Sequence, residues 1–247
     1  MLKALIWDVD GTIAETERDG HRIAFNLAFE ALGLAWRWDL ALYAELLHVA
    51  GGQERLLHDM ARRPDAPPAG AERQALMLEV HGRKNRFYTD IVARSGLPAR
   101  PGVKRLVAEC QAAGVKMAVA TTTSRGNVAA LFASLWGEHW RDIFPVVVGA
   151  EDAAVKKPDP LAYRIALQRL GVPAADAFAL EDSPNGLQAA RAAGVACGVT
   201  RSEFFVDAVF EGAAWVRGDL DEAPAMTLAR LLQSGSGSIS WNPMSGA

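Results

Sequence analysis

The sequence has few cysteines and no long apolar run, and each absence excludes a class of protein. Its two cysteines, Cys110 and Cys197, have apolar neighbours, which is typical of reduced thiols in a protein core rather than of a disulfide scaffold. No apolar run approaches the roughly 20 residues of a membrane-spanning helix. The first residues lead into a strand without the pattern of a signal peptide. We therefore expect a soluble cytoplasmic protein.

The sequence also has no long run of residues with the same charge. Acidic and basic residues are interspersed, and the formal net charge is −3. This pattern indicates neither a nucleic-acid-binding surface nor a polybasic membrane anchor, so we expect neither nucleic acid nor a membrane as a partner. The 247 residues are enough for one large domain or two modest ones.

The first apolar run, Ala4 to Trp7, predicts a buried strand that stops at two carboxylates, Asp8 and Asp10. Gly11 permits a tight turn there, and Thr12 offers a hydroxyl and an N–H to an anion. Ligands of parallel sheets bind at the carboxyl ends of strands, where two acids can hold Mg²⁺ and one can act as a nucleophile. An ordinary turn remains the alternative, because Asp and Gly are favoured turn residues.

The next segment, residues 18–87, has helical periodicity and no strand pattern. Ile23, Leu27 and Ala31 follow at four-residue spacing, Gly33 can end that helix, and Glu72 to Thr89 predicts one long helix. We interpret residues 18–87 as an all-helical cap domain.

Strands and helices alternate after this segment. Strands are predicted at residues 116–121, 144–149, 177–180, 195–199 and 215–216, with a helix before each of the first four. This alternation predicts an α/β fold with a Rossmann-like, doubly wound parallel-sheet core, formed by residues 1–17 and 88–233 around the inserted cap. The Ser- and Gly-rich residues 234–247 are expected to be disordered.

Polar residues follow the strands of this predicted sheet. Thr121 follows the second strand, Lys157 comes after the third, and Glu181 and Asp182 follow the fourth. Together with the two acids after the first strand, they would gather at one edge of the sheet. Phosphoryl transfer requires such a set, because a metal and a cation must neutralise phosphate oxygens and donors must hold them.

These motifs, in this order, resemble the haloacid dehalogenase superfamily, in the class whose helical cap lies between the first two strands. The resemblance covers the chain to about residue 200. The segments from Glu17 to Asn26, from Gly51 to Arg55 and from Thr121 to Ser124 further resemble the CbbY group. Members of that group are phosphatases that remove the 1-phosphate of xylulose-1,5-bisphosphate, an inhibitory by-product of Rubisco in the Calvin cycle.

The resemblance implies a role for each motif. Asp8 would attack phosphorus and Asp10 would act as general acid and base, while Thr121 and Lys157 would hold the phosphoryl oxygens. The implied ligands of Mg²⁺ are Asp8, the backbone carbonyl of Asp10, Asp182 and, through water, Glu181. Lys156 is interpreted as a solvated neighbour of Lys157.

The cap is expected to bind the unreacting part of the substrate. Gly51, Gly52 and Arg55 are candidates for a distal phosphate, since glycine allows close approach and arginine binds phosphate bidentately. Further substrate-binding candidates are Glu17, His21, Lys84, Thr122, Thr123, Ser124 and Asn127. Alternatives stay open: His21 and Lys84 as surface residues, and Ser124 to Asn127 as the start of a helix. The other histidines, 48, 58, 81 and 139, are assigned structural or surface roles, and Trp36 and Trp38 are assigned to the cap core.

Taken with this resemblance, the sequence leads us to expect an Mg²⁺-dependent phosphatase that acts through an aspartyl-phosphate; the resemblance further implies xylulose-1,5-bisphosphate as the substrate and a monomeric enzyme. Three alternatives remain. A phosphomutase resembling β-phosphoglucomutase would use the same residues, and a phosphatase could act on another metabolite such as phosphoglycolate. A non-catalytic phospho-aspartate switch also gathers acids and a lysine, but it needs neither a second acid at position 10 nor a cap.

Overall fold

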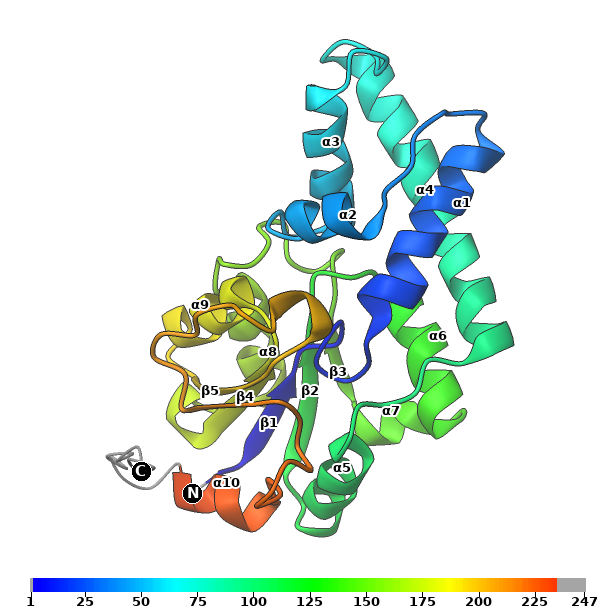
Figure 1. Ribbon diagram of the computed structural model, residues 1–247. Coiled ribbons are helices and arrows are strands. Elements are labelled where there is room, and N and C mark those ends of the chain that lie inside the picture. Colours follow the sequence, from blue (N-terminus) through cyan, green and yellow to red (C-terminus); the bar gives the residue numbers. More distant parts are fainter. Residues whose placement is uncertain (1, 235–247) are drawn as a thin grey trace, which may run out of the picture.

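The computed structural model describes residues 2–234 and contains a six-stranded parallel sheet (Figure 1). Its strand order is β3-β2-β1-β4-β5-β6. The strands are β1 (Ala4–Trp7), β2 (Lys116–Ala120), β3 (Val146–Val148), β4 (Ala177–Glu181), β5 (Ala196–Thr200) and β6 (Trp215–Arg217). The predicted disorder of residues 234–247 falls, from residue 235 on, outside the described part.

Both faces of the sheet are buried, as the uninterrupted apolar runs of its strands require. Leu5 and Trp7 face one apolar cluster, and Ala4 and Ile6 face another. The first cluster includes residues of α5 (Val103–Ala112), α6 (Arg125–Trp136), α7 (Trp140–Ile143) and α10 (Leu228–Ser234). The second includes residues of α8 (Leu161–Leu170) and α9 (Pro184–Ala192). The doubly wound α/β prediction is confirmed.

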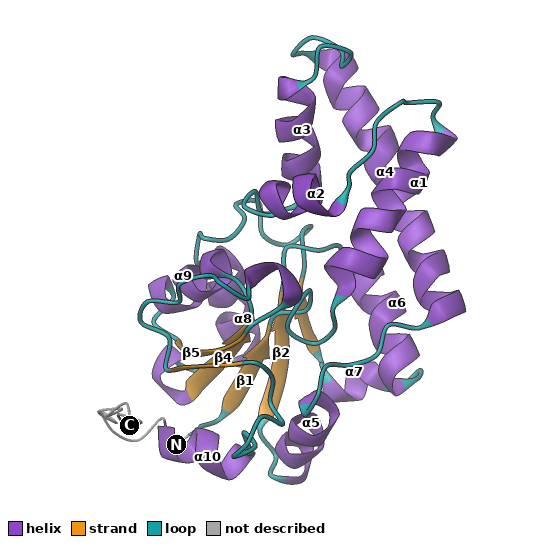
Figure 2. Ribbon diagram, in the orientation of Figure 1, coloured by secondary structure: helices purple, strands orange, loops and turns teal. Residues whose placement is uncertain are grey.

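Between β1 and α5 the regular elements of the chain are all helices, and most of their length lies beyond the carboxyl ends of the strands (Figure 2). We call this part the helical insertion. It consists of a π-helix, η1 (Glu17–His21), and of α1 (Arg22–Ala31), α2 (Leu40–Leu46), α3 (Gly52–Arg62) and α4 (Ala71–Ser95). Trp36 and Trp38 are buried in its own apolar cluster, as predicted.

Helix α4 is longer than the predicted segment, which ended at Thr89. Its last turns are not part of the insertion's own core: Tyr88 and Val92 pack into the cluster on the sheet, together with Leu97 just beyond the helix. Burial against the sheet therefore extends the helix to Ser95, which is a tertiary effect that local periodicity does not reveal.

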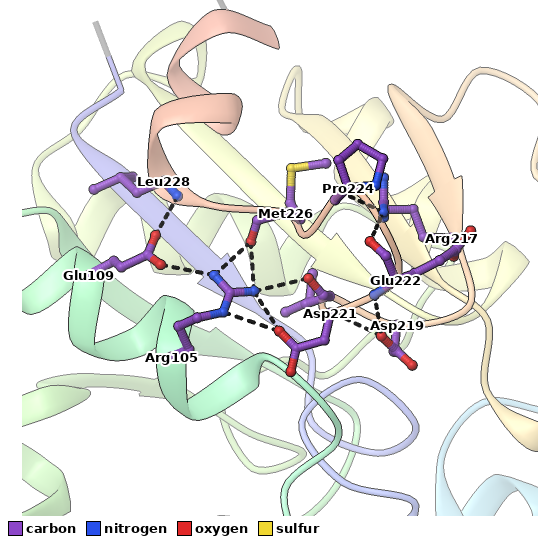
Figure 3. A network of polar contacts seen from close by, with 10 residues as sticks. Arg105, Glu109, Arg217, Asp219, Asp221, Glu222, Pro224, Met226 and Leu228 are labelled. Carbon is purple, nitrogen blue, oxygen red and sulfur yellow. Dashed lines mark hydrogen bonds and ion pairs between the residues drawn. The ribbon is translucent and has the colours of Figure 1, made fainter.

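The C-terminal segment is attached to α5 by a polar network (Figure 3). Arg105 donates to the carbonyl oxygens of Leu220 and Met226 and pairs with the carboxylate of Asp221 at 2.8 Å. Glu109 accepts the backbone N–H of Leu228 at 2.7 Å. These contacts hold α10 beside α5, against the face of the sheet.

Two predictions about excluded features can be compared with the structure. Cys110 and Cys197 are free and buried, as expected. Among residues 2–234, no helix combines the length and apolarity that crossing a bilayer requires.

Candidate active site

The carboxyl ends of β1 and β4 bring the predicted carboxylates together. Trp7 pairs with Leu180 in the sheet, so Asp8 and Glu181 leave their strands at the same level. The ammonium of Lys157 lies between them, 2.6 Å from Oδ1 of Asp8 and 2.5 Å from Oε1 of Glu181. All three side chains are buried, and Thr12 donates to the other oxygen of Asp8 at 3.3 Å.

The pKa values of these carboxyl groups follow from their burial and from the neighbouring charges. Burial raises the pKa of Asp8 well above its usual range, and the Lys157 ammonium opposes that effect. Burial also raises the pKa of Asp182, and the charges of Asp8 and Glu181 add to the increase. The site therefore concentrates negative charge that a single lysine does not neutralise, which is a suitable environment for a divalent cation.

The donor set fits such a cation. Carboxylate oxygens of Asp8, Glu181 and Asp182 all lie within 4.8 Å of one another. Oxygen ligands of this kind are those that Mg²⁺ prefers. Glu181 is the most enclosed of the three, because it accepts from Lys157 and, at 2.6 Å, from the hydroxyl of Tyr163. Asp182 is held on its other side by Ser202, which donates to Oδ2 at 2.6 Å.

Asp10 has different partners from Asp8. Its Oδ1 accepts the hydroxyl of Thr16 at 2.5 Å and lies 3.0 Å from Nε2 of His21, whose ring stacks on Tyr88. Burial alone would raise the pKa of Asp10, but the charge and hydrogen bond of His21 and the hydrogen bond from Thr16 lower it to about 2. His21 is 3% exposed, so its interpretation as a surface histidine is wrong.

A cavity of about 260 Å³ lies between Asp10 and the helical insertion. The predicted residues that line it are Glu17, His21, Gly51, Gly52, Arg55, Lys84, Thr122, Thr123 and Ser124. Asn127 is buried behind this wall, where its amide donates to Asn85 at 3.1 Å. Thr121 is also buried, and its hydroxyl accepts the backbone N–H of Thr123 at 3.2 Å.

Two cations of the insertion face this cavity. Arg55 donates to the hydroxyl of Tyr43 at 3.1 Å and lies 3.6 Å from Glu17, to which Tyr43 also donates. Nε of Arg55 is buried and has no hydrogen-bond partner among the described residues. Lys84 is 3% exposed, so the surface alternative is wrong for it too. Its ammonium lies 5.2 and 5.4 Å from the ring centroids of Phe25 and Tyr88, and within residues 2–234 it forms no ion pair, although the charges of Glu17 and Asp10 act on it.

Some residues of the cavity were missed or misjudged from the sequence. His81 was assigned a structural or surface role but lines the cavity, three residues before Lys84 on the same face of α4. Burial and the charge of Lys84 lower the pKa of His81 to about 4. Lys156 is not a solvated neighbour: it is half-buried, lines the cavity, and donates to the carbonyl oxygens of Ala150 and Ala153 at 2.6 and 2.8 Å. Three further residues contact predicted site residues but belong to no motif in the sequence: Tyr43, Tyr163 and Ser202.

Comparison with known proteins decides the family. The model of the haloacid dehalogenase-like hydrolases matches residues 2–194. The chain belongs to this family. Within it, the chain is 46% identical to protein CbbY encoded on a plasmid of Cupriavidus necator, over 87% of this chain and 84% of the relative. It is 42% identical to protein CbbY of Rhodobacter capsulatus, over 93% of this chain and 99% of the relative.

A solved structure of a haloacid dehalogenase-like hydrolase has the same fold at high similarity. CbbY from Rhodobacter sphaeroides, in complex with xylulose-(1,5)bisphosphate, superposes with a TM-score of 0.84. That protein is 40% identical, and the match covers 92% of this chain and 98% of the other. These similarities, together with the acidic cluster at the strand ends, show that the enzyme is a phosphatase. Its family is generally metal-dependent.

Proposed function

We propose that the enzyme removes the 1-phosphate of xylulose-1,5-bisphosphate, with Mg²⁺ as cofactor and the helical segment 18–87 as a substrate-selecting cap. The observation that carries this proposal is the cavity, which has Asp10 at its sheet end and buried cations, Lys84 and Arg55, on the insertion. A second phosphate would give the Lys84 ammonium a direct anionic partner, since Glu17 and Asp10 act on it only at longer range. The relatives named CbbY, one of them solved with this bisphosphate, support the same substrate.

In the first half of the proposed reaction, a carboxylate oxygen of Asp8 attacks phosphorus. The bond from phosphorus to the sugar oxygen breaks, and Asp10 gives that oxygen a proton, which leaves an aspartyl-phosphate. Lys157 and the polar groups of Thr12 and Thr121 would hold the phosphoryl oxygens. Because the incoming phosphate is an anion, it raises the pKa of Asp10 above its value in the free enzyme and favours the protonated acid.

In the second half, water attacks the phosphorus of the aspartyl-phosphate. Asp10, now a carboxylate held by Thr16 and His21, takes a proton from that water. The bond from phosphorus to the Asp8 oxygen breaks and phosphate leaves. Mg²⁺, held by Asp8, Asp182 and the backbone carbonyl of Asp10 with Glu181 acting through water, would neutralise phosphoryl charge.

The candidate residues for the distal phosphate are Lys84, Arg55 and the N-terminus of α3 at Gly52. His81 would add a neutral donor beside them. We also propose that the enzyme is monomeric and acts in the cytoplasm. Thr122, Thr123 and Ser124 face the cavity from the sheet side and would complete the wall around the substrate.

Replacing Arg55 with alanine should affect bisphosphates more than monophosphates. We expect kcat/KM for xylulose-1,5-bisphosphate to fall by about 100-fold, because a charge-assisted contact to phosphate is lost in a buried cavity. The loss for a sugar monophosphate should be less than about fivefold by the same reasoning. Steady-state phosphate release measures both. An equal loss on the two substrates would contradict a distal-phosphate role.

Replacing Lys84 with methionine should stabilise the free enzyme at pH 7. Burial lowers the pKa of Lys84 to about 8. The unfolded chain therefore binds more protons than the native state between about pH 8 and the usual lysine value, and the charged side chain destabilises the native state below that window. We expect Lys84→Met to raise the free energy of unfolding, measured in urea at pH 7, by about 1–3 kcal/mol. KM for the bisphosphate should also rise. A gain that grows above pH 10 would contradict this assignment.

The substrate is tested by phosphate release in Mg²⁺ across a panel of sugar mono- and bisphosphates that includes phosphoglycolate. We expect kcat/KM for xylulose-1,5-bisphosphate to exceed the others by at least about tenfold. Uniform weak activity would contradict this substrate while keeping the phosphatase. Conversion of a hexose 1-phosphate into its 6-phosphate would indicate a mutase instead.

A further inference from the structure

Arg100 lies where the helical insertion rejoins the sheet, between α4 and α5. Its backbone N–H donates to the carbonyl of Ile13 at 2.8 Å, and Ala99 forms an antiparallel bridge with Ala14. The returning segment is therefore paired with the segment that leaves the Asp8–Asp10 loop. Arg100 occupies the sheet side of this junction.

The guanidinium of Arg100 contacts three loops at the carboxyl edge of the sheet. Nη1 donates to the carbonyl of Gly11 after β1, and to the carbonyl and hydroxyl of Thr200 at the end of β5, at 3.1 and 3.2 Å. Nη2 donates to the carbonyls of Arg201 and, after β6, Gly218, at 2.5 and 2.8 Å. Nε lies 3.2 Å from the carboxylate of Glu15, and the arginine side chain is only 9% exposed.

Two of these loops enclose Asp182. Ser202, the residue after Arg201, donates its hydroxyl to Oδ2 of Asp182. Gly11 packs against the same carboxylate so closely that a Cβ there would come within 2.1 Å of Oδ2, and within 2.9 Å of Cβ of Ser202. The position of Asp182 therefore depends on the separation of the Gly11 and Ser202 backbones. Arg100 joins Gly11 to Thr200 and Arg201, the two residues directly before Ser202.

We propose that Arg100 is a positioning residue for the metal site: by fixing the β1 and β5 loops to each other, it sets the separation between Asp182 and Asp8. This inference rests on the proposed function in taking the Asp8, Asp182 cluster as the site of a divalent cation. Arg100 touches neither the cation's carboxylates nor the substrate cavity, and its effect is transmitted through Gly11 and Ser202. Residues that orient metal ligands in this way commonly affect metal affinity by about 10–100-fold.

An arginine is required for this arrangement because its planar fork presents five N–H groups in fixed directions. An ammonium has three donors and cannot reach carbonyl groups on three loops together with the carboxylate of Glu15. The substitution Arg100→Lys therefore keeps the charge and removes the geometry. Arg105→Lys is the matched control, because Arg105 also joins loop carbonyls, those of Leu220 and Met226, to a helix, away from the site.

The test is Mn²⁺ binding to the complete, substrate-free protein, followed by the electron paramagnetic resonance of the free ion. We expect Arg100→Lys to raise the Kd for Mn²⁺ about tenfold and Arg105→Lys to change it less than about twofold. With subsaturating Mg²⁺, kcat should fall in Arg100→Lys while KM for the sugar phosphate stays the same. Thermal unfolding of both variants checks that each is folded.

A Kd for Mn²⁺ that is unchanged in folded Arg100→Lys overturns the proposal, and so does an equal increase in both variants. If Arg100→Lys does not fold, Glu15→Ala removes one contact of Arg100 at a half-exposed position, and we expect a Kd increase of about threefold. An unchanged Kd in Glu15→Ala would then overturn the proposal. Failure of the unmodified protein to bind Mn²⁺ would instead overturn the metal site of the proposed function, and this inference with it.

Discussion

Replacing Asp8 with asparagine is expected to lower kcat by about 10⁴-fold or more and to leave the fold intact. The amide cannot attack phosphorus, and removal of a nucleophile abolishes the covalent route altogether. The asparagine amide has nearly the same shape as the carboxyl group that it replaces, and Lys157 keeps its ion pair with Glu181 at 2.5 Å. Unfolding free energy should therefore change by less than about 1 kcal/mol.

Phosphate release and urea unfolding of the same preparation measure both effects. Asp10→Asn is the informative companion, because it keeps the nucleophile and removes the acid and base. It should lose about 10²–10⁴-fold in kcat, the usual contribution of general acid–base catalysis. If Asp8→Asn kept more activity than Asp10→Asn, Asp8 would not be the nucleophile.

Replacing Lys157 with methionine should be the most destabilising of these substitutions. It leaves two buried carboxylates, Asp8 and Glu181, without the ammonium between them. Removing one partner of a buried ion pair costs about 3–5 kcal/mol. The two carboxylates hold the pKa of Lys157 above its usual value although burial opposes them. Its stabilising contribution is therefore complete below the unfolded-state pKa of lysine and is lost only as pH rises through the raised value.

Urea unfolding at pH 7 tests this prediction, with Lys156→Met as the control. Lys156 donates to two backbone carbonyls and forms no ion pair within the described residues, so its loss should cost about 1–2 kcal/mol. Equal costs for the two lysines would show that the contacts of Lys157 with Asp8 and Glu181 do not stabilise the native state. Activity should fall at least about 10³-fold in Lys157→Met because the phosphoryl oxygens lose their cation.

The fold and the sheet end of the site were predictable because one rule locates both. Apolar runs without alternation indicate strands buried on both faces, and parallel strands bring their carboxyl ends to one edge. Asp8, Lys157 and Asp182 therefore meet although they are far apart in sequence. The same rule applied to the fifth strand would have found Ser202, which lies two residues after the strand ends at Thr200.

The insertion end of the site was harder to predict, because its contacts depend on how helices pack. Tyr43 reaches Glu17 only after α2 docks beside η1, and no local pattern encodes that contact. His81 was within reach of sequence reasoning: with Lys84 assigned to the cavity, the residue three positions earlier shares its face of α4. Lys156 was misjudged because its partners are backbone carbonyls of a loop, which leave no trace in the sequence.

The central claim, that Asp8 carries the phosphoryl group between substrate and water, can be tested most directly by mass spectrometry of acid-quenched enzyme. The wild type is mixed with excess xylulose-1,5-bisphosphate and Mg²⁺, quenched during turnover, and digested. We predict a peptide containing Asp8 that is heavier by one phosphoryl group and that disappears when substrate is exhausted. Phosphate release at full rate with that peptide always unmodified, or with the group on another residue, would contradict the account.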